Sequence, residues 1–306
     1  MIVVVCPGQG SQTPGFLAPW LAEPSFADRL SALSEAAGAD LTRHGTESDA
    51  DTIRDTAIAQ PLIVAAGILA FDALAAEGRR AAIGGVAGHS VGEITAAAAT
   101  GVLDAADAMR FVAERGRAMA DAAALEPTGM SAVIGADETE LLARLETLGL
   151  EPANFNGGGQ IVVAGAVDAL EQLKAEPPAG ARVIPLQVAG AFHTRYMQPA
   201  RERLAEVALS VSASDPDLTL WTNRDGSPVA SGASFVELLV GQVASPVRWD
   251  RCMASFAEAG VTGIIELAPA GALVGLAKRA LKGVPTVAVK TPDDLPAAIE
   301  LLAQAA

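Results

Sequence analysis

Residues 82–99, AIGGVAGHSVGEITAAAA, contain the strand, turn and helix that decide the fold. The apolar run at residues 82–88 predicts a buried strand of a parallel sheet, and the alanine-rich end of the segment predicts a helix. Between them, GHSVG at residues 88–92 is a G-x-S-x-G pentapeptide whose glycines permit a sharp turn that exposes a serine. Ser90 is therefore the candidate nucleophile, and the following helix offers backbone N–H groups to an oxyanion. The alternative is an ordinary strand-to-helix loop.

The rest of the large part of the chain continues this alternation of strands and helices. Residues 2–6, IVVVC, predict a buried strand, and the glycine-rich PGQGSQ after it predicts a tight loop. Asp104 is a suitable N-cap for a helix that extends to about residue 122. Such alternation is typical of α/β proteins with a parallel sheet. Further helices are expected at residues 16–37 and 56–77, the second with Pro61 near its start, and further strands near 218–223 and 263–269.

Residues 127–188 have a different order of elements. The pattern predicts strand, helix, strand, strand, helix and strand, which is the order of the ferredoxin-like module. We therefore expect a small ferredoxin-like (βαββαβ) subdomain at 127–188, inserted into an α/β unit made of residues 1–126 and 189–306. The strands are expected at 129–135, 151–155, 161–165 and 182–188, and the helices at 138–149 and 167–175.

The composition excludes several classes of function. The 306 residues include 36 acidic and 21 basic side chains, and the net charge of −15 argues against binding nucleic acid through its phosphates. The longest uninterrupted apolar stretch, residues 62–71, reaches only about half of a membrane span. No basic residue precedes Arg29, so the positive region of a signal peptide is missing, and we expect a cytoplasmic protein. Cys6 and Cys252 lie in apolar contexts that favour buried free thiols.

A serine nucleophile needs a general base, and the chain contains 3 histidines. His89 is adjacent to Ser90 on a sharp turn, where neighbouring side chains diverge, so we interpret it as a supporting residue. His44 lies in the polar stretch LTRHGTESD, which is typical of a surface loop. His193 follows an apolar strand, and loops at the carboxyl ends of strands gather around a site in α/β proteins. His193 is therefore the predicted base, with a core histidine as the alternative.

Arg115 is a candidate for binding a carboxylate. On a helical wheel of residues 104–122 it falls at the edge of the apolar arc and so points toward the interior. A buried guanidinium requires an anion or a carbonyl partner, and its planar fork matches a carboxylate. The alternative is an arginine that extends to solvent or satisfies a helix C-terminus. No acidic residue stands out as the third member of a triad, and Asp250 and Glu266 are candidates only by position.

Further motifs follow one another along the chain. They are PGQGSQ at 7–12, GHSVGE at 88–93, ERGRAM at 114–119, NFNGGGQIVVAG at 154–165, AFHT at 191–194, SPVRW at 245–249 and ELAPAGALVGLAKR at 266–279. Together they resemble the malonyl-CoA:acyl carrier protein transacylase family, and the resemblance covers essentially the whole chain. It implies an α/β-hydrolase-like core with a parallel sheet and a ferredoxin-like insert.

The resemblance also implies a role for each candidate residue. Ser90 would be the acyl nucleophile and His193 its base. Arg115 would pair with the malonyl carboxylate. The backbone carbonyl of Gln242 would orient His193, which would make a dyad without an acid. The other implied site residues are Gln9 and Val91, whose backbone N–H groups would form the oxyanion hole, Asn156 and Gln160 in the cleft between the subdomains, and Asn223 near His193.

The implied reaction is ping-pong acyl transfer. Ser90 would take malonyl from malonyl-CoA, and the phosphopantetheine thiol of acyl carrier protein would then remove it, for fatty acid or polyketide synthesis. By the same resemblance, the AFH sequence that ends at His193 implies a preference for malonyl over methylmalonyl. The expected protein is a monomer that binds neither a membrane nor a permanent cofactor or metal. Because carrier proteins are usually acidic, docking needs a local basic patch. The candidates for that patch are Arg195, Arg248, Arg251, Lys278 and Arg279.

Three alternative functions remain open at this stage. A serine esterase or thioesterase would use Ser90 and His193 with water as the acceptor, and it would not need Arg115 as a cationic partner. A non-catalytic subunit that binds carrier protein could keep the same fold. The malonyl transferase component of a malonate decarboxylase shares these motifs, and the identity of the accepted carrier protein would separate it.

Overall fold

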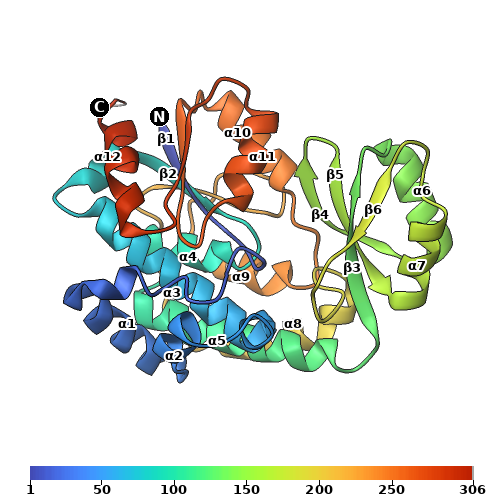
Figure 1. Ribbon diagram of the computed structural model, residues 1–306, viewed down its shortest axis with the longest axis horizontal. Helices are drawn as coiled ribbons and strands as arrows, with labels where there is room; N and C mark the ends of the chain where they lie inside the picture. Colours follow the sequence, from blue (N-terminus) through green and yellow to red (C-terminus); the bar gives the residue numbers. More distant parts are fainter. Residues whose placement is uncertain (305–306) are drawn as a thin grey trace.

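The larger of two sheets has five strands, all parallel, in the order β7-β2-β1-β8-β9. The structure is a computed structural model that describes residues 1–304. Figure 1 shows this sheet with helices on both of its faces. The strands expected near residues 2–6, 82–88, 218–223 and 263–269 all belong to it. Its strands are β1 (Ile2–Cys6), β2 (Ile83–Gly88), β7 (Thr219–Trp221), β8 (Gly263–Glu266) and β9 (Thr286–Ala288).

Alternate residues of β1 enter two separate apolar cores. Ile2, Val4 and Cys6 belong to the cluster that includes the long helices on one face, whereas Val3 and Val5 belong to the cluster on the other face. Both faces are thus covered, which explains why β1 is apolar at every position. The helices are α1 (Pro24–Ala37), α2 (Leu41–Thr46), α3 (Thr56–Ala75), α4 (Gly92–Ala99), α5 (Ala105–Ala123), α8 (Gln198–Ala208), α9 (Gly232–Gln242), α10 (Trp249–Glu258), α11 (Ala272–Ala280) and α12 (Leu295–Ala303).

Helix α3 is the core helix of this unit. Its length and composition would suffice to cross a membrane, but 78% of its most apolar window is buried inside the protein, as expected for a core helix. The helix expected at residues 56–77 is confirmed, with Pro61 near its start but beyond the first turn. Pro61 lies inside α3 and has no N–H with which to donate the helical hydrogen bond to Ala57. The helix expected at residues 16–37 begins only at Pro24, the first residue of α1. Most of the residues from 16 to 23 form turns instead.

The second sheet has four antiparallel strands in the order β4-β5-β3-β6. This arrangement and the βαββαβ element order confirm the ferredoxin-like interpretation. In Figure 1, α6 and α7 cover the face of this sheet that points away from the larger unit. The strand expected at 182–188 is shorter and ends at Pro185. The elements are β3 (Thr128–Ile134), α6 (Glu138–Leu148), β4 (Glu151–Gly157), β5 (Gln160–Ala166), α7 (Val167–Ala175) and β6 (Arg182–Pro185).

A short backbone pairing joins the two units beside the site. The N–H of Phe155 in β4 donates to the carbonyl of Val247, and the N–H of Val247 donates to the carbonyl of Ala153, both over 2.9 Å. Val247 lies between α9 and α10 of the larger unit. The small sheet is therefore fixed against the segment that follows Gln242. The division at residues 127 and 188 stays a prediction.

Candidate active site

Ser90 occupies a sharp turn between β2 and α4, with a left-handed φ of 54°. A Cβ at Gly88 would lie 2.0 Å from the carbonyl carbon of Gly92, and a Cβ at Gly92 would lie 2.1 Å from the carbonyl oxygen of Cys6. At both positions a side chain would clash with neighbouring backbone atoms, so only glycine fits at residues 88 and 92. A positive φ at a serine costs about 1–3 kcal/mol and persists only where the surroundings enforce it. The pentapeptide therefore builds the predicted turn that presents a serine.

Ser90 and His193 form a hydrogen-bonded pair. The distance between Ser90 Oγ and His193 Nε2 is 2.7 Å, and that between His193 Nδ1 and the backbone carbonyl oxygen of Gln242 is 2.9 Å. Because a carbonyl only accepts, Nδ1 carries the proton and Nε2 is left to accept the hydroxyl proton of Ser90. His193 is 4% exposed and also has a left-handed φ, of 63°. The two residues that the sequence singled out are thus brought together in the geometry of a nucleophile and its base.

Neither acidic candidate completes a triad. Asp250 accepts two hydrogen bonds from the guanidinium of Arg248, over 2.9 and 2.6 Å. Glu266 is fully buried and accepts from the N–H groups of Leu273 and Val274 at the start of α11. The position behind His193 belongs to the carbonyl of Gln242, so the pair is a dyad.

Burial, and then the charge of Arg115, lowers the pKa of His193 to about 3. The neutral form, which is the base, therefore persists until the pH falls to that lowered pKa. We expect the second-order rate constant for acylation of Ser90 by an uncharged ester, p-nitrophenyl acetate, to show no acid limb from His193 between pH 8 and about 5. Stopped-flow measurement of p-nitrophenol release checks this, and a decline centred near pH 6.5 would contradict it.

Arg115 lies inside the protein, as the helical wheel predicted, and is 1% exposed. Its Nη1 donates to Gln60 Oε1 and its Nη2 to Gln242 Oε1, each over 2.7 Å. Nη2 is also 3.4 Å from Ser90 Oγ. Burial lowers the pKa of Arg115 to about 10, so the group is charged at neutral pH. Within residues 1–304 no carboxylate pairs directly with it, and this leaves a buried cation beside the nucleophile.

Gln9 and Val91 flank the nucleophile from two loops. Gln9 follows β1, and Val91 is the N-cap of α4. Among residues 1–304, neither backbone N–H donates to a protein acceptor, although the side chain of Gln9 donates to the Arg54 carbonyl over 3.3 Å. Both residues line the same cleft as Ser90. Two available N–H groups beside a serine can stabilise an oxyanion.

His89 turns away from Ser90 and toward the small sheet. Its Nε2 lies 2.9 Å from Asn156 Oδ1, and Asn156 Nδ2 donates to Gln160 Oε1 over 3.1 Å. Burial lowers the pKa of His89, which favours its neutral form. The rings of His89 and Trp249 pack in a T-shaped arrangement, with centroids 5.7 Å apart. These contacts connect the nucleophile turn to β4 and β5 and line the cleft between the two sheets.

Asn223 holds the turn that carries Ser90. Its Oδ1 accepts from the backbone N–H of Ser90 over 2.8 Å, and its Nδ2 donates to the carbonyl of Gly88 over 2.6 Å. Asn223 therefore binds the turn whose serine contacts His193, and its expected place near His193 stays a prediction. The strained backbone of Ser90 is enforced by this side chain.

Two buried polar residues of the site were not anticipated. Gln60 in α3 receives a hydrogen bond from Arg115, and Glu93 in α4 receives hydrogen bonds from the backbone of Asn223 and the side chain of Gln242. Both interrupt otherwise apolar helices, and such an interruption is a signal that the sequence offered. His44 does not lie in the expected surface loop. It is half-buried in α2 and forms a hydrogen bond with Ser48. Cys6 and Cys252 are free and buried, as predicted.

The catalytic groups open into a cleft of about 370 Å³ between the two sheets. Its lining includes polar and apolar side chains from both units. Among the described residues, no group of three or more histidine, cysteine, aspartate or glutamate side chains is arranged to hold a metal ion. The residues that line the cleft include Gly8, Gln9, Gln60, His89, Ser90, Met119, Met130, Asn156, Gln160, Val188, Phe192, His193, Leu273 and Arg279.

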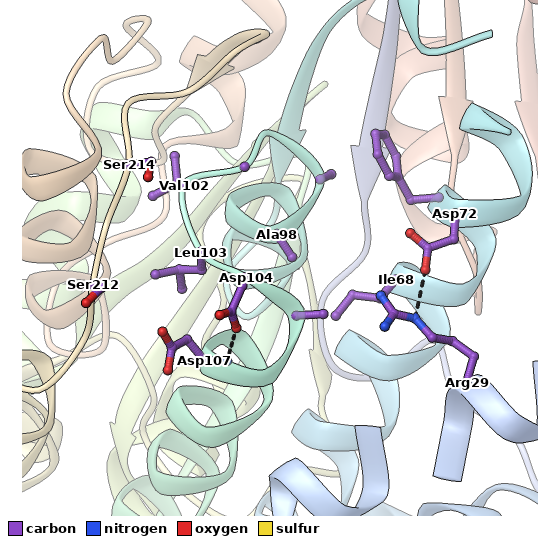
Figure 2. Close-up of a pocket in the computed structure, with 14 residues that line it drawn as sticks. Arg29, Ile68, Asp72, Ala98, Val102, Leu103, Asp104, Asp107, Ser212 and Ser214 are labelled. Carbon is purple, nitrogen blue, oxygen red and sulfur yellow. Dashed lines mark hydrogen bonds and ion pairs between the residues drawn. The ribbon is translucent and has the colours of Figure 1, made fainter. Parts of the chain in front are cut away.

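A second hollow, of about 470 Å³, lies beside α3 and α5 and contains no member of the dyad (Figure 2). Its acidic side chains are already engaged. Asp72 pairs with Arg29 over 2.9 Å, Asp104 caps α5 by accepting from the N–H of Asp107, and Asp107 pairs with Arg110. Within residues 1–304, this hollow therefore has no unpaired charged group, comparable to Arg115, that could bind a ligand.

Comparisons with known proteins agree with this geometry. The Acyl transferase domain family matches residues 3–293. The chain is 55% identical over 299 residues to malonyl CoA-acyl carrier protein transacylase of Mycobacterium tuberculosis (strain ATCC 25618 / H37Rv), covering 96% of this chain and 98% of that protein. It is 33% identical over 304 residues to the Escherichia coli (strain K12) protein of the same name, covering 97% and 98%.

Solved structures give the same result. The crystal structure of MCAT from Mycobacterium tuberculosis superposes with a TM-score of 0.95 at 54% identity, covering 98% of this chain and 99% of that chain. A malonyl-transacylase solved in complex with its type II PKS acyl-carrier protein superposes with a TM-score of 0.92 at 31% identity, covering 98% and 99%. The similarity therefore extends over both sheets and the cleft between them.

Proposed function

The chain belongs to the malonyl-CoA:acyl carrier protein transacylase family, and we propose that it transfers malonyl from malonyl-CoA to the phosphopantetheine thiol of an acyl carrier protein. One observation carries the proposal. The buried guanidinium of Arg115, without a paired carboxylate among residues 1–304, lies 3.4 Å from the oxygen of Ser90, which is hydrogen-bonded to His193. A nucleophile beside an unpaired cation suits an acyl group that carries its own carboxylate.

In the first half-reaction, Ser90 Oγ attacks the thioester carbonyl carbon while His193 Nε2 takes the hydroxyl proton. The carbonyl oxygen becomes an oxyanion that accepts from the N–H groups of Gln9 and Val91. When the carbon–sulfur bond breaks, His193 returns the proton to the departing coenzyme A sulfur, and malonyl remains on Ser90. The second half-reaction runs the same steps in reverse, with the phosphopantetheine thiol as the nucleophile.

The walls of the cleft support selection of the acyl group. The malonyl carboxylate would receive hydrogen bonds from Arg115, whose fork is already oriented by Gln60 and Gln242. Phe192 is 5% exposed and lines the cleft next to His193, where a branched acyl group would meet it. One methyl group changes binding in such a pocket by only about 1–3 kcal/mol, so we expect discrimination against methylmalonyl to be modest.

A transfer assay with intact-mass spectrometry tests the proposal. Brief incubation with malonyl-CoA should add one malonyl group to Ser90, and purified holo-carrier protein should then remove it with formation of malonyl-carrier. Acetyl-CoA and methylmalonyl-CoA are the comparison donors. Absence of any adduct would support a non-catalytic carrier-binding subunit, and rapid loss of the adduct to water without carrier would support a thioesterase. Both outcomes would overturn the proposed function.

Docking of the carrier is proposed at the end of α11. Of the candidate patch, Arg195 already pairs with Glu151 and Arg248 with Asp250. Lys278 and Arg279 lie in the last turn of α11, and Arg279 also lines the cleft.

We expect the double variant K278E/R279E to raise the KM for carrier protein about tenfold at low salt, because a basic patch steers an acidic partner. Steady-state kinetics with varied carrier measure it. R195E, which reverses a charge that pairs with Glu151 rather than facing a partner, is the control. Equal effects of both changes would place docking elsewhere.

The remaining properties are also proposals. We expect a cytoplasmic monomer without a permanently bound cofactor, supplying extender units for fatty acid or polyketide synthesis. A malonyl transferase of a malonate decarboxylase would use the same dyad. The identity of the carrier protein that accepts malonyl from Ser90 separates these functions.

A further inference from the structure

Glu93 is a buried carboxyl group that the proposed chemistry does not use. It lies in the first turn of α4, three residues after Ser90, and is 1% exposed. It does not line the catalytic cleft, but borders a separate cavity of about 770 Å³ together with Gln242. Burying a carboxylate is costly unless its oxygens receive hydrogen bonds. The hydrogen-bond partners of Glu93 therefore indicate its role in the protein.

Glu93 binds two neighbours of the dyad. Its Oε1 accepts from the backbone N–H of Asn223 over 2.6 Å, and its Oε2 accepts from the side-chain amide of Gln242. The same amide nitrogen of Gln242 also donates to the carbonyl oxygen of Ser90 over 3.0 Å. Two acceptors, one carboxylate and one carbonyl, therefore face the NH₂ group of Gln242.

These acceptors determine which way the Gln242 amide points. With its NH₂ group directed at Glu93 and Ser90, its Oε1 faces Arg115 Nη2 over 2.7 Å. The opposite orientation would place an NH₂ group against a guanidinium, two donors without an acceptor, and an oxygen against a carboxylate. Glu93 thus keeps Gln242 oriented as an acceptor for Arg115.

The charges around Glu93 are consistent with this arrangement. Arg115 on α5 is the cation that acts on it and favours its ionised form, and the thiol of Cys252 on α10 lies within range of its charge. Burial nevertheless raises the pKa of Glu93 to about 7. Asn223 and Gln242, which bind it directly, are neutral. The carboxyl group of Glu93 and the guanidinium of Arg115 therefore bind opposite ends of the same Gln242 amide.

We propose that Glu93 is a positioning residue that holds Gln242, and through it Arg115, in the orientation that receives the carboxylate of the acyl donor. The inference rests on the proposed function and deepens it. Gln242 also holds His193 through its backbone carbonyl, so one residue connects the base to the cation, and Glu93 fixes its side chain. Glu93 thereby sets the preference for acidic over neutral acyl groups.

The variant E93Q tests the proposal because it keeps the size of the side chain but replaces one acceptor oxygen with a donor. We expect kcat/KM for malonyl-CoA to fall about thirtyfold and kcat/KM for acetyl-CoA to fall less than threefold. A merely structural role would lower both equally, and that result would overturn the proposal. In the R115A background, E93Q should leave the malonyl-to-acetyl ratio unchanged, since the guanidinium it positions is absent.

E266Q is the matched control. Glu266 is also a fully buried carboxyl, but it accepts from the N–H groups of Leu273 and Val274 and has no contact with Gln242 or Arg115. Its loss should reduce the melting temperature without changing the malonyl-to-acetyl ratio. A ratio that falls as much in E266Q as in E93Q would overturn the proposal, because any buried carboxyl would then suffice.

The unmodified protein provides a second measurement that does not depend on a variant folding. Glu93 is ionised above its pKa and loses an acceptor when protonated below it, so the malonyl-to-acetyl ratio of kcat/KM should fall as pH decreases from 8 to 6. The malonyl carboxylate itself titrates far below this range. A ratio that stays constant across pH 7 contradicts the proposal. Failure of the wild-type chain to form any malonyl adduct would instead overturn the proposed function.

Discussion

Replacing Ser90 with alanine should abolish the malonyl adduct and lower kcat for malonyl transfer by about 10⁴-fold or more. The change removes only the hydroxyl group, whose oxygen accepts the acyl group in the first half-reaction and releases it in the second. Losing a nucleophile of a serine–histidine pair has effects of this size elsewhere. Binding of malonyl-CoA should persist, since Arg115 and the oxyanion donors are unchanged.

Intact-mass spectrometry after incubation with malonyl-CoA, together with a carrier-dependent transfer assay, measures both effects. Ser34→Ala is the matched control, because its buried hydroxyl has no hydrogen-bond partner among residues 1–304 and no contact with the cleft. A malonyl adduct of wild-type yield on the Ser90→Ala protein would show that another residue is the nucleophile. The dyad would then have to be abandoned.

The parts of the site that depend on local sequence could be predicted. The turn at Ser90 follows from glycines at fixed spacing between a strand and a helix, and Arg115 follows from its position on a helical wheel. His193 could be singled out because the chain has only 3 histidines and one of them follows a predicted apolar strand. Each inference needed only a few neighbouring residues.

The parts that depend on distant contacts could not be predicted. Gln242 is 152 residues from Ser90, and its side chain meets Ser90, Glu93 and Arg115 only after the sheet has assembled. Glu93 belongs to the GHSVGE motif, but a carboxyl that binds an amide on another helix leaves no periodic signal. The hydrogen bonds of Asn223 to the Ser90 turn likewise form only in the folded chain.

The fold shows a similar division. The alternation of apolar runs predicted the central strands and the βαββαβ order, because period and length are local properties. The short edge strand β9 (Thr286–Ala288) was not expected, since three half-buried residues give little pattern. Pro61 lies beyond the first turn of α3, the turn in which proline is tolerated, but burial of α3 on most of its surface stabilises the helix despite the missing hydrogen bond.

Backbone strain connects the fold to the chemistry. Ser90 and His193 both have positive φ angles, and both are held by hydrogen bonds from side chains or backbone of other elements. Asn223 Oδ1 accepts from the N–H of Ser90, and the carbonyl of Val243 accepts from the N–H of His193 over 3.0 Å. The two catalytic side chains are thus aimed at each other by rigid neighbours, which reduces the reorganisation needed during the reaction.

Replacing Arg115 with alanine should remove the preference for malonyl-CoA. The change leaves the carboxylate of the acyl group in a buried site without its cation, and breaking such a pair costs about 3–5 kcal/mol, so kcat/KM for malonyl-CoA should fall about 10³-fold. Transfer from acetyl-CoA needs no such partner and should fall less than tenfold. Arg115→Lys keeps the charge but cannot bond Gln60, Gln242 and a carboxylate together, so we expect it to recover only a small part of the loss.

Competition between malonyl-CoA and acetyl-CoA for Ser90, read by mass spectrometry, measures this preference directly. Arg117→Ala is the matched control, because Arg117 lies on the same helix but is exposed and paired with Glu114. Unchanged selectivity in Arg115→Ala would refute the role of the guanidinium in recognising the acyl carboxylate. A selective loss for malonyl would instead show that the buried charge, and not the shape of the cleft, recognises the substrate, since alanine only enlarges the space.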